Sequence, residues 1–322
     1  MGRHRKRVSR ALAAYLTLAV GGVFRVLPLP WSRALARALG RLAYYVVPRI
    51  RKVGFANLDL AYGDSLTRAE KRRILRDSVD NVAVVAAEFS RLRVRARTGF
   101  EDCVRVEGVE HIDRRQGVLL VSGHQGNWEW MASIMAGFGY KVAEVVRPLD
   151  HAALNRFVDA FRTAPGVRTI PKHAAGGEVL RLLRAGWLVG ILIDQAPREN
   201  GVPVTFFGAP CWATAAPALV AARARVPVHP VAMIRQPDGA YVLEIRPALS
   251  LVRTGSLADD LAENTQRCQA ALETLVRDHP GQWLWFHRRW KRRPRLEREW
   301  AARREKRRAG RQAATDASEA DF

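Results

Sequence analysis

The sequence predicts an α/β fold in which a mainly parallel sheet is flanked by helices. Of the 322 residues, 48% are hydrophobic, which is enough to build a sizeable core. From Gly99 onward, short apolar runs alternate with helix-length segments, as in βαβ units. The three cysteines, Cys103, Cys211 and Cys268, are far apart in the sequence, which excludes a disulfide framework and a zinc finger.

Residues 1–30 are predicted to form a basic N-terminus followed by a hydrophobic membrane anchor. Five Lys or Arg residues precede an uncharged run over residues 11–24. This run is shorter than the roughly 20 residues that a spanning helix needs, unless flanking arginines snorkel. The segment from Gly21 to Arg25 is also a poor signal-peptide cleavage site. Whether the anchor spans the membrane or lies in its interface stays open.

The next segment is predicted to be a basic amphipathic helix. Arg33, Arg37 and Arg41 recur every four residues on one face, and Leu39 and Leu42 lie on another. This pattern suits the surface of an anionic membrane. A core helix with a solvated arginine face is the alternative. The two N-terminal segments together favour a membrane-attached protein whose bulk lies on the cytoplasmic side.

The charge is concentrated at the two ends of the chain. Lys and Arg number 53 against 31 Asp and Glu, a formal net charge of +22. Residues 1–52 carry +12 and residues 288–322 carry +7, so the body between them carries only +3. Such ends can bind phosphate in lipid headgroups or in nucleic acid. The apolar N-terminal run, the nearly neutral body and the lack of a recognised nucleic-acid module oppose nucleic-acid binding.

The body divides into helices and strands in a regular order. A capping box from Thr67 to Glu70 predicts a helix that reaches Phe89. Strands are expected at CVRVEG, GVLLVSG, KVAEVV, WLVGILID, VPVHPVAMI and YVLEIRP, with helices between them and a last helix over residues 257–278. Residues 31–293 are therefore taken as one catalytic domain. Residues 294–322 are predicted to be a basic, disordered tail.

One strand leads directly into a candidate catalytic pair. The strand GVLLVSG ends at Gly123, and His124 follows it at the sheet edge where open α/β proteins bind ligands. Glu129 lies five residues further on, from where its carboxylate is expected to reach back and fix the imidazole tautomer. Such a dyad suits a base that deprotonates a hydroxyl for attack on an acyl carbonyl. Taken alone the spacing is weak, because a histidine near a helix start is more often structural.

Five segments in order resemble one known family. They are HQGNWE at 124–129, RP at 147–148, LIDQ at 192–195, VTFFG at 204–208 and PGQWLWFHRRWK at 280–291. Together they resemble the late acyltransferases of bacterial lipid A biosynthesis, the lauroyl and myristoyl transferases, from about residue 10 to 293. Two departures, Ala216 where this family often has Gly and His151 where Asn is common, put the exact substrate in doubt but leave the dyad intact.

The resemblance implies a glycerolphosphate-acyltransferase-like fold and a role for each motif residue. His124 would be the general base and Glu129 its orienting partner. Arg147 would bind phosphate or polarise the carbonyl, and Asp194 would stabilise the site by pairing with Arg147. Asp194, Asn127 and Gln195 would contact the substrate. Trp283, Trp285 and Trp290 lie beside cations and would suit the membrane interface.

The resemblance also implies the reaction. The enzyme would move a fatty acyl chain from acyl carrier protein, or less readily coenzyme A, to a hydroxyl of a phosphorylated glycolipid at the cytoplasmic face of the inner membrane. No metal or further cofactor is expected. The alternatives are another glycolipid acceptor, such as a phosphatidylinositol mannoside acylated from acyl-CoA, a remote nucleic-acid-binding role and an inactive membrane scaffold.

Overall fold

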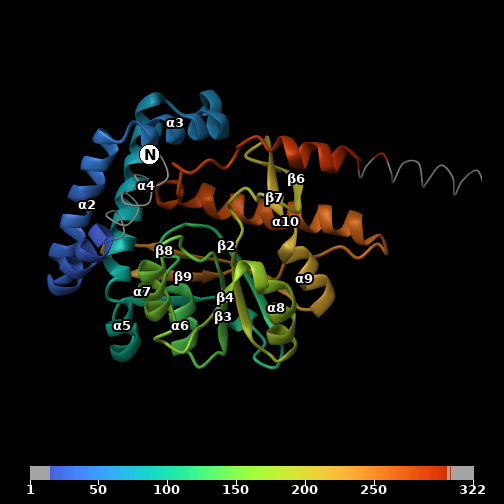
Figure 1. Cartoon of the computed structure of the whole chain (residues 1–322), viewed down its shortest axis with the longest axis horizontal. Helices are drawn as coiled ribbons and strands as arrows, with labels where there is room; N and C mark the ends of the chain where they lie inside the picture. The colour runs from blue at the N-terminus through green and yellow to red at the C-terminus, as the bar shows by residue number, and fades with distance from the viewer. Residues whose placement is uncertain (1–14, 303–304, 306–322) are drawn as a thin grey trace, which may run out of the picture.

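The computed structural model describes residues 15–302 and residue 305 (Figure 1). Its centre is a seven-stranded sheet in the order β1-β9-β8-β2-β5-β3-β4. The pair β8–β9 is antiparallel and every other neighbouring pair in this sheet is parallel. This confirms the predicted α/β class with a mainly parallel sheet. The strands are β1 (Val104–Glu107), β2 (Val118–Ser122), β3 (Val142–Val146), β4 (Arg168–Pro171), β5 (Leu188–Leu192), β8 (Val228–Arg235) and β9 (Tyr241–Ile245).

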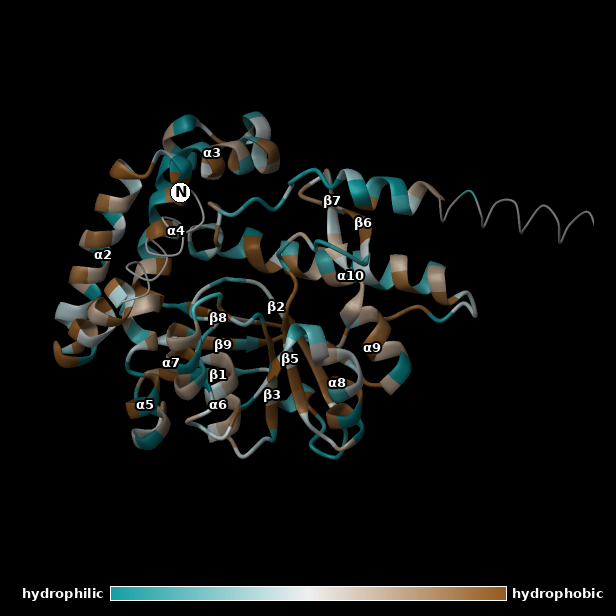
Figure 2. Cartoon of the chain, in the orientation of Figure 1, coloured by the Kyte–Doolittle hydropathy of each residue, from teal (hydrophilic) through white to brown (hydrophobic). Residues whose placement is uncertain are grey.

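Helices cover both faces of this sheet. The helices between residues 90 and 280 are α5 (Leu92–Thr98), α6 (Met131–Gly137), α7 (Ala152–Arg162), α8 (Ala175–Arg184), α9 (Ala216–Ala224) and α10 (Leu257–Asp278). Leu119 and Val121 of β2 pack with α8, α9 and α10, whereas Val118 and Leu120 pack with α6 and α7. This alternation follows the two-residue period of a strand that is buried on both faces. Figure 2 shows the resulting apolar strands between the flanking helices.

The N-terminal helices form a separate layer beside the sheet (Figure 1). Residues 15–26 are helical, followed by α2 (Leu29–Val46), α3 (Pro48–Tyr62) and α4 (Arg68–Phe89). The predicted capping box at Thr67 is confirmed, since Thr67 and Glu70 exchange side-chain and backbone hydrogen bonds. Small residues of α2, among them Ala36 and Gly40, are buried against α4. None of the helices described is both apolar enough and long enough to cross a bilayer.

Three features differ from the predicted elements. Residues 201–214 form a hairpin, β6 (Gly201–Phe206) and β7 (Ala209–Thr214), that the sequence analysis left unassigned. Its turn residues Phe207 and Gly208 both have positive φ, as a type I′ turn requires. Strand β4 was also left unassigned. Residues 294–302, predicted as disordered, are helical with Leu296 buried, while residues 1–14 and most of the predicted tail lie outside the described residues.

Short 3₁₀ turns connect several of these elements. They span Gly63–Ser65, Val109–His111, Lys172–Ala174 (η3) and Pro280–Gln282 (η4). The last of them packs against α4 and leads into a buried Trp-rich segment. The N-terminal helices, the sheet and the C-terminal segment therefore meet at the carboxyl end of β2, where the candidate site lies.

Candidate active site

The register of two central strands brings His124 and Asp194 together. Strands β2 and β5 are parallel neighbours, and Ser122 pairs with Leu192 at their ends. His124 and Asp194 each follow two residues later, so the two chains leave the sheet side by side. The imidazole Nδ1 of His124 lies 2.8 Å from Asp194 Oδ1. The carboxyl edge of a parallel sheet is where α/β proteins place their ligands.

Asp194 is a fixed, fully buried acceptor. Besides the imidazole, it accepts the backbone N–H of His124 at 2.8 Å and the indole N–H of Trp283 at 3.1 Å, both on Oδ2. Its side chain is completely inaccessible to solvent. Three hydrogen bonds compensate for the burial of this carboxylate. The predicted pairing of Asp194 with Arg147 is wrong, because the Asp194 carboxylate faces His124 and Trp283, and its predicted contact with the substrate stays a prediction.

This pairing shapes the protonation of both groups. Burial disfavours a charged imidazole, but the Asp194 carboxylate outweighs burial and raises the pKa of His124. Burial likewise opposes ionisation of Asp194, yet the adjacent imidazole and its hydrogen bonds lower the pKa of Asp194. With Nδ1–H donated to the carboxylate, Nε2 carries the free lone pair of the neutral ring. That nitrogen lies 3.5 Å from the Gln195 side-chain amide, at the exposed side of the pair.

Glu129 does not orient the imidazole, so this part of the predicted dyad is wrong. Its carboxylate forms a two-pronged ion pair with Arg162 of α7, with distances of 2.9 and 2.7 Å. The prediction assumed a helix from His124, but the chain turns irregularly through residues 124–130 and α6 begins only at Met131. Glu129 still acts on His124 through space, because its negative charge raises the pKa of the imidazole.

A second carboxylate shares Arg162. Glu144 of β3 lies 3.5 Å from the guanidinium, and burial raises its pKa to about 7. Burial opposes the charge on Arg162, but Glu129 and Glu144 together raise the pKa of the guanidinium. Sequence analysis missed both Arg162 and Glu144. A charged Glu within an otherwise apolar strand was the signal available for Glu144.

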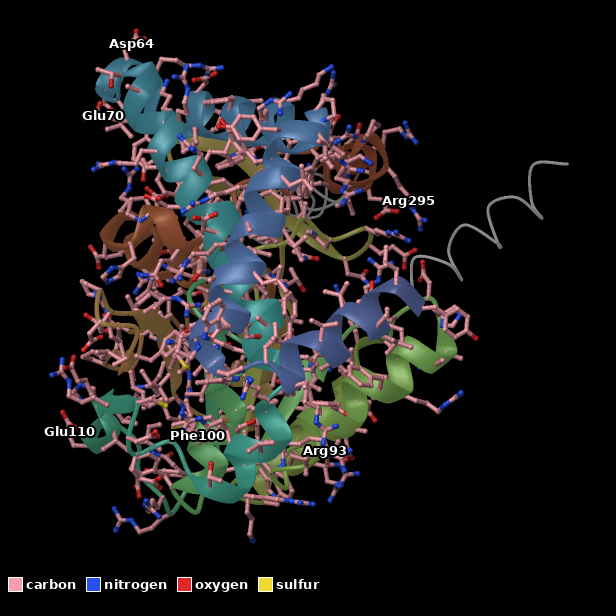
Figure 3. All side chains as sticks on the ribbon, turned by 90° about the vertical axis from the view of Figure 1, so that its left-hand side faces the viewer. Asp64, Glu70, Arg93, Phe100, Glu110 and Arg295 are labelled. Carbon is pink, nitrogen blue, oxygen red and sulfur yellow. The ribbon has the colours of Figure 1, made fainter. Side chains whose placement is uncertain are left out.

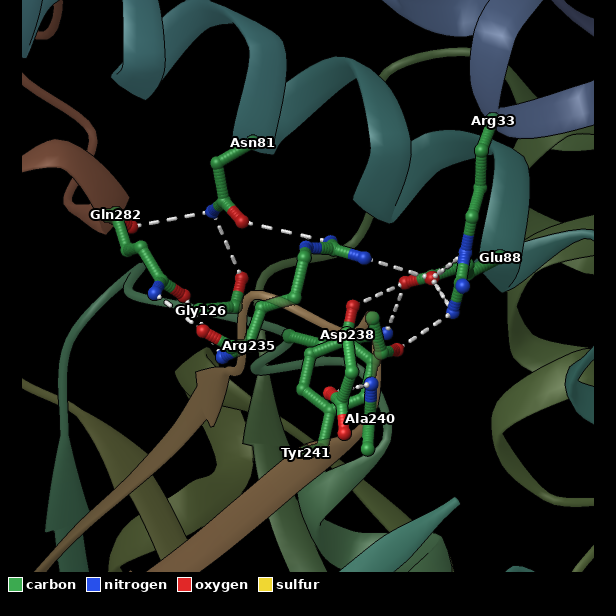
Figure 4. Close-up of polar contacts among 11 residues, drawn as sticks. Arg33, Asn81, Glu88, Gly126, Arg235, Asp238, Ala240, Tyr241 and Gln282 are labelled. Carbon is green, nitrogen blue, oxygen red and sulfur yellow. Dashed lines mark hydrogen bonds and ion pairs between the residues drawn. The ribbon is translucent and has the colours of Figure 1, made fainter. Parts of the chain in front are cut away.

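The loop after His124 rests on a buried polar network (Figure 4). Glu88 of α4 is fully buried and accepts hydrogen bonds from Arg33, Arg235 and Asn127, as well as from the hydroxyl of Tyr241. Asn127 is therefore fully buried and holds the loop, and its predicted contact with the substrate stays a prediction. The network ties α2, α4 and β8 to the loop that carries the candidate base.

Gly126 fixes the path of the same loop. Its φ is +55°, and its backbone pairs with that of Met233. A Cβ at this position would lie 1.6 Å from the Met233 carbonyl oxygen. Only glycine fits such a close approach in the left-handed region. The local sequence Gly-His-Gln-Gly-Asn thus serves to turn the chain sharply behind His124.

His124 opens onto a large cavity of about 2680 Å³. Arg147, Gln195, Glu129 and Arg162 also line this cavity, so the structure places predicted residues Arg147 and Gln195 where they can meet a ligand. Apolar side chains from β2, α6, β8 and β9 also line it: Leu120, Met131, Met135, Val231, Leu243 and Ile245. With both polar and apolar side chains in its lining, the cavity can take a long apolar chain next to a polar headgroup.

The tryptophans near residue 285 have a structural role. Trp283 and Trp285 are fully buried, and Trp290 is partly buried with its indole N–H donated to the Phe206 carbonyl. The prediction that these three rings lie at a membrane interface is therefore wrong for Trp283 and Trp285. Trp283 instead anchors Asp194. Within the described residues, no group of three or more His, Cys, Asp or Glu side chains is placed to hold a metal ion.

Comparisons with known proteins agree with the motifs. The family described as bacterial lipid A biosynthesis acyltransferase matches residues 2–292. A lipid A biosynthesis acyltransferase of Haemophilus influenzae is 25% identical over 87% of this chain and 90% of its own length. A lipid A biosynthesis lauroyltransferase of Escherichia coli is 23% identical over 86% of this chain and 91% of its own.

Among solved structures, the 1-acyl-sn-glycerophosphate acyltransferase PlsC of Thermotoga maritima aligns with 18% identity and a TM-score of 0.33. It covers 74% of this chain and 98% of its own. That score is too low to establish a shared fold. The family match across nearly the whole chain confirms the resemblance found in the motifs. This chain therefore belongs to the bacterial lipid A biosynthesis acyltransferase family and is an acyltransferase.

Proposed function

We propose that this enzyme transfers a fatty acyl chain from acyl carrier protein to a hydroxyl of a lipid A precursor, at the cytoplasmic face of the inner membrane. The observation that carries the proposal is the His124–Asp194 pair at the edge of an apolar cavity. An imidazole whose Nδ1–H is held by a carboxylate leaves Nε2 able to accept a proton, which suits the activation of a hydroxyl.

In the proposed reaction, His124 accepts a proton from the acceptor hydroxyl and then donates it to the leaving thiolate. Nε2 takes the proton of the acceptor hydroxyl as the oxygen attacks the thioester carbonyl, and the resulting imidazolium is stabilised by Asp194. The tetrahedral intermediate collapses with cleavage of the carbon–sulfur bond, and the imidazolium returns the proton to the leaving thiolate. One ester forms and one thioester breaks, so no further cofactor is consumed. This use of a carboxylate-oriented imidazole follows the logic of the serine-protease triad.

Glu129 and Arg162 support this base without exchanging protons with it. Their ion pair joins the loop after β2 to α7, which fixes the position of the loop on the cavity wall. The negative charge of Glu129 also favours the imidazolium that forms during attack. In this proposal Glu129 is a positioning residue, and the direct partner of His124 is Asp194.

The outer face of the N-terminal layer supports a location at a membrane. Large apolar side chains on residues 15–26 and on α2 point to solvent, with Trp31 70% and Leu42 56% exposed. Figure 3 looks onto this side of the molecule. Residues 15–26 also contribute Leu16, Val20 and Phe24 to the cavity lining. A lipid acceptor can therefore enter the cavity from the same side that meets the bilayer.

Mass spectrometry of lipids tests the proposal. The full chain and its His124→Ala variant are expressed in a bacterial host that lacks its own late acyltransferases, and lipid A is extracted. We expect the wild type to add one acyl mass to the precursor, and the variant to add none at equal protein levels. An unchanged lipid A profile with the wild-type protein present in membranes would contradict the proposed acceptor.

A further inference from the structure

Three cations gather at the cavity edge, at the ends of three neighbouring strands. Val146 at the end of β3 pairs with Pro171 at the end of β4, so Arg147 and Lys172 leave the sheet side by side. Strand β5, on the other side of β3, leads to a loop that carries Arg198. All three residues line the cavity that His124 also lines.

Among residues 15–302, these cations have no carboxylate partner. Within the described part of the chain, none of the three side chains forms a hydrogen bond or ion pair. Glu178 pairs with Arg168 and Arg181, and Glu199 pairs with Arg295. Asp150 also lines the cavity and forms no ion pair with any of the three cations. Burial and repulsion from Arg147 and Arg198 lower the pKa of Lys172, so the three charges are close enough to interact. A cluster of unpaired like charges is electrostatically costly unless an anion binds to it.

The N-terminus of a helix lies at the same cavity wall. Lys172 begins the 3₁₀ turn η3, which leads directly into α8, a helix of 10 residues. Ala175 and Gly176, the first two residues of α8, line the cavity with the cations. The free N–H groups of a first helical turn and the positive end of the helix dipole favour an anion.

We infer that Arg147, Lys172, Arg198 and the N-terminus of α8 form a binding site for a phosphate group, on the sheet edge beside His124. The inference deepens the proposed function and rests on it for the identity of the substrate. A phosphate group can come from the headgroup of a glycolipid acceptor or from the pantetheine arm of a carrier-bound donor. Lys172, Arg198 and the helix terminus extend the role predicted for Arg147 alone.

A binding measurement tests the site without acyl transfer. Isothermal titration compares dodecyl phosphate with the uncharged dodecyl glucoside on the full-length protein. We expect the wild type to prefer the phosphate, and Lys172→Gln and Arg198→Gln each to weaken phosphate binding roughly tenfold, the size of one charged hydrogen bond, with glucoside binding unchanged. Arg184→Gln, which removes an exposed charge from the other end of α8, serves as the matched control.

Gly176→Asp separates loss of the site from loss of the fold. A side chain at this position has open space, and an acid in the first turn of α8 favours the helix. The variant should keep the wild-type midpoint of thermal unfolding or exceed it, while its negative charge repels the phosphate and abolishes the preference. Phosphate binding that is unchanged in Lys172→Gln, Arg198→Gln and Gly176→Asp would overturn the inference, as would an equal loss of glucoside binding.

Kinetics then identify the source of the phosphate. If the defect of Lys172→Gln disappears with a dephosphorylated acceptor, the site holds the acceptor headgroup. If it disappears with an acyl N-acetylcysteamine thioester in place of the acyl carrier protein, the site holds the donor. A defect that persists when both substrates lack phosphate contradicts the inference. Failure of the proposed function gives a different result: the wild type would still prefer dodecyl phosphate over dodecyl glucoside, but it would not acylate a glycolipid.

Discussion

At the scale of single residues, the account depends on one hydrogen bond between His124 Nδ1 and Asp194 Oδ1. The carboxylate raises the pKa of His124 against the effect of burial. A general base works in its neutral form, so kcat/KM should fall as the pH drops through this raised pKa, above the ordinary value of about 6.5.

Asp194→Asn should reverse this shift and damage catalysis. Without the carboxylate, burial dominates and lowers the pKa of His124, so the acid limb of the kcat/KM profile moves to lower pH. Activity at the optimum should drop roughly 10²–10⁴-fold, because the imidazolium loses its counter-charge and its tautomer is no longer fixed. The profile is measured from pH 5 to 9. Glu144→Gln is the control, since burial raises the pKa of Glu144 to about 7 but Glu144 does not contact His124. An unmoved acid limb in Asp194→Asn would remove Asp194 from the mechanism.

The ion pair between Glu129 and Arg162 predicts strong coupling in a double-mutant cycle. Both side chains are mostly buried. Glu129→Gln leaves the Arg162 guanidinium with only Glu144 as a partner, and Arg162→Gln leaves the Glu129 and Glu144 carboxylates without their cation. Each single change should lower the free energy of unfolding by about 3 kcal/mol, and the double change by little more. Urea denaturation of the four proteins measures this. Additive losses would mean that the pair contributes no interaction energy of its own.

At the scale of elements, the loop between β2 and α6 depends on Gly126. Gly126→Ala places a Cβ 1.6 Å from the Met233 carbonyl oxygen, in addition to the cost of its positive φ. Gly208→Ala in the β6–β7 turn has a similar φ, but nothing lies within 4 Å of its Cβ. We expect about 1–2 kcal/mol of destabilisation for Gly208→Ala and about 3 kcal/mol or more for Gly126→Ala. Equal unfolding midpoints for the two variants in urea would contradict the described path of the loop.

Local sequence signals predicted most elements, and tertiary contacts determined the rest. The bounds of α10 follow from its apolar period, and the start of α4 follows from the Thr67 capping box. The hairpin β6–β7 was missed because its turn lies at Phe207 and Gly208, without the Asn-Gly or Asp-Gly signal typical of such turns. Trp283 resembles an interfacial residue in sequence, and only packing against Asp194 and Phe206 shows it as core.

For the site, the sequence predicted the position of single residues at strand ends, but not which strands are neighbours. His124 and Asp194 both follow apolar strands by two residues, a signal that places both at the sheet edge. That β2 and β5 are neighbours in register is a property of the tertiary structure. The sequence analysis therefore chose Glu129 as the partner of His124 from the five-residue spacing within one segment. The irregular turn through residues 124–130 then separates Glu129 from the imidazole, and Arg162 binds it from a helix distant in sequence.

At the scale of the whole molecule, the outer face of α2 predicts binding to anionic membranes. Trp31 and Leu42 are largely exposed there, and their insertion into lipid should each contribute about 1.5–3 kcal/mol. The double change of Trp31→Ser and Leu42→Ser should therefore weaken cosedimentation with anionic vesicles at least tenfold. Phe138→Ser is the matched control, since Phe138 is 47% exposed at the end of α6. Equal effects of the control and the double change would place the membrane face elsewhere.

The central claim is that His124, oriented by Asp194, is the base that activates the acceptor hydroxyl for acyl transfer. The most direct measurement is the initial rate of transfer from acylated carrier protein to a phosphorylated lipid A precursor by purified wild type and His124→Ala. Because His124→Ala leaves the buried Asp194 carboxylate with two of its three hydrogen bonds, the unfolding midpoint of the variant is measured as well, and the rates are compared at a temperature where both proteins are folded. We predict a rate lower by roughly 10²–10⁴-fold for the variant. A near-normal rate for a folded His124→Ala protein would contradict the account.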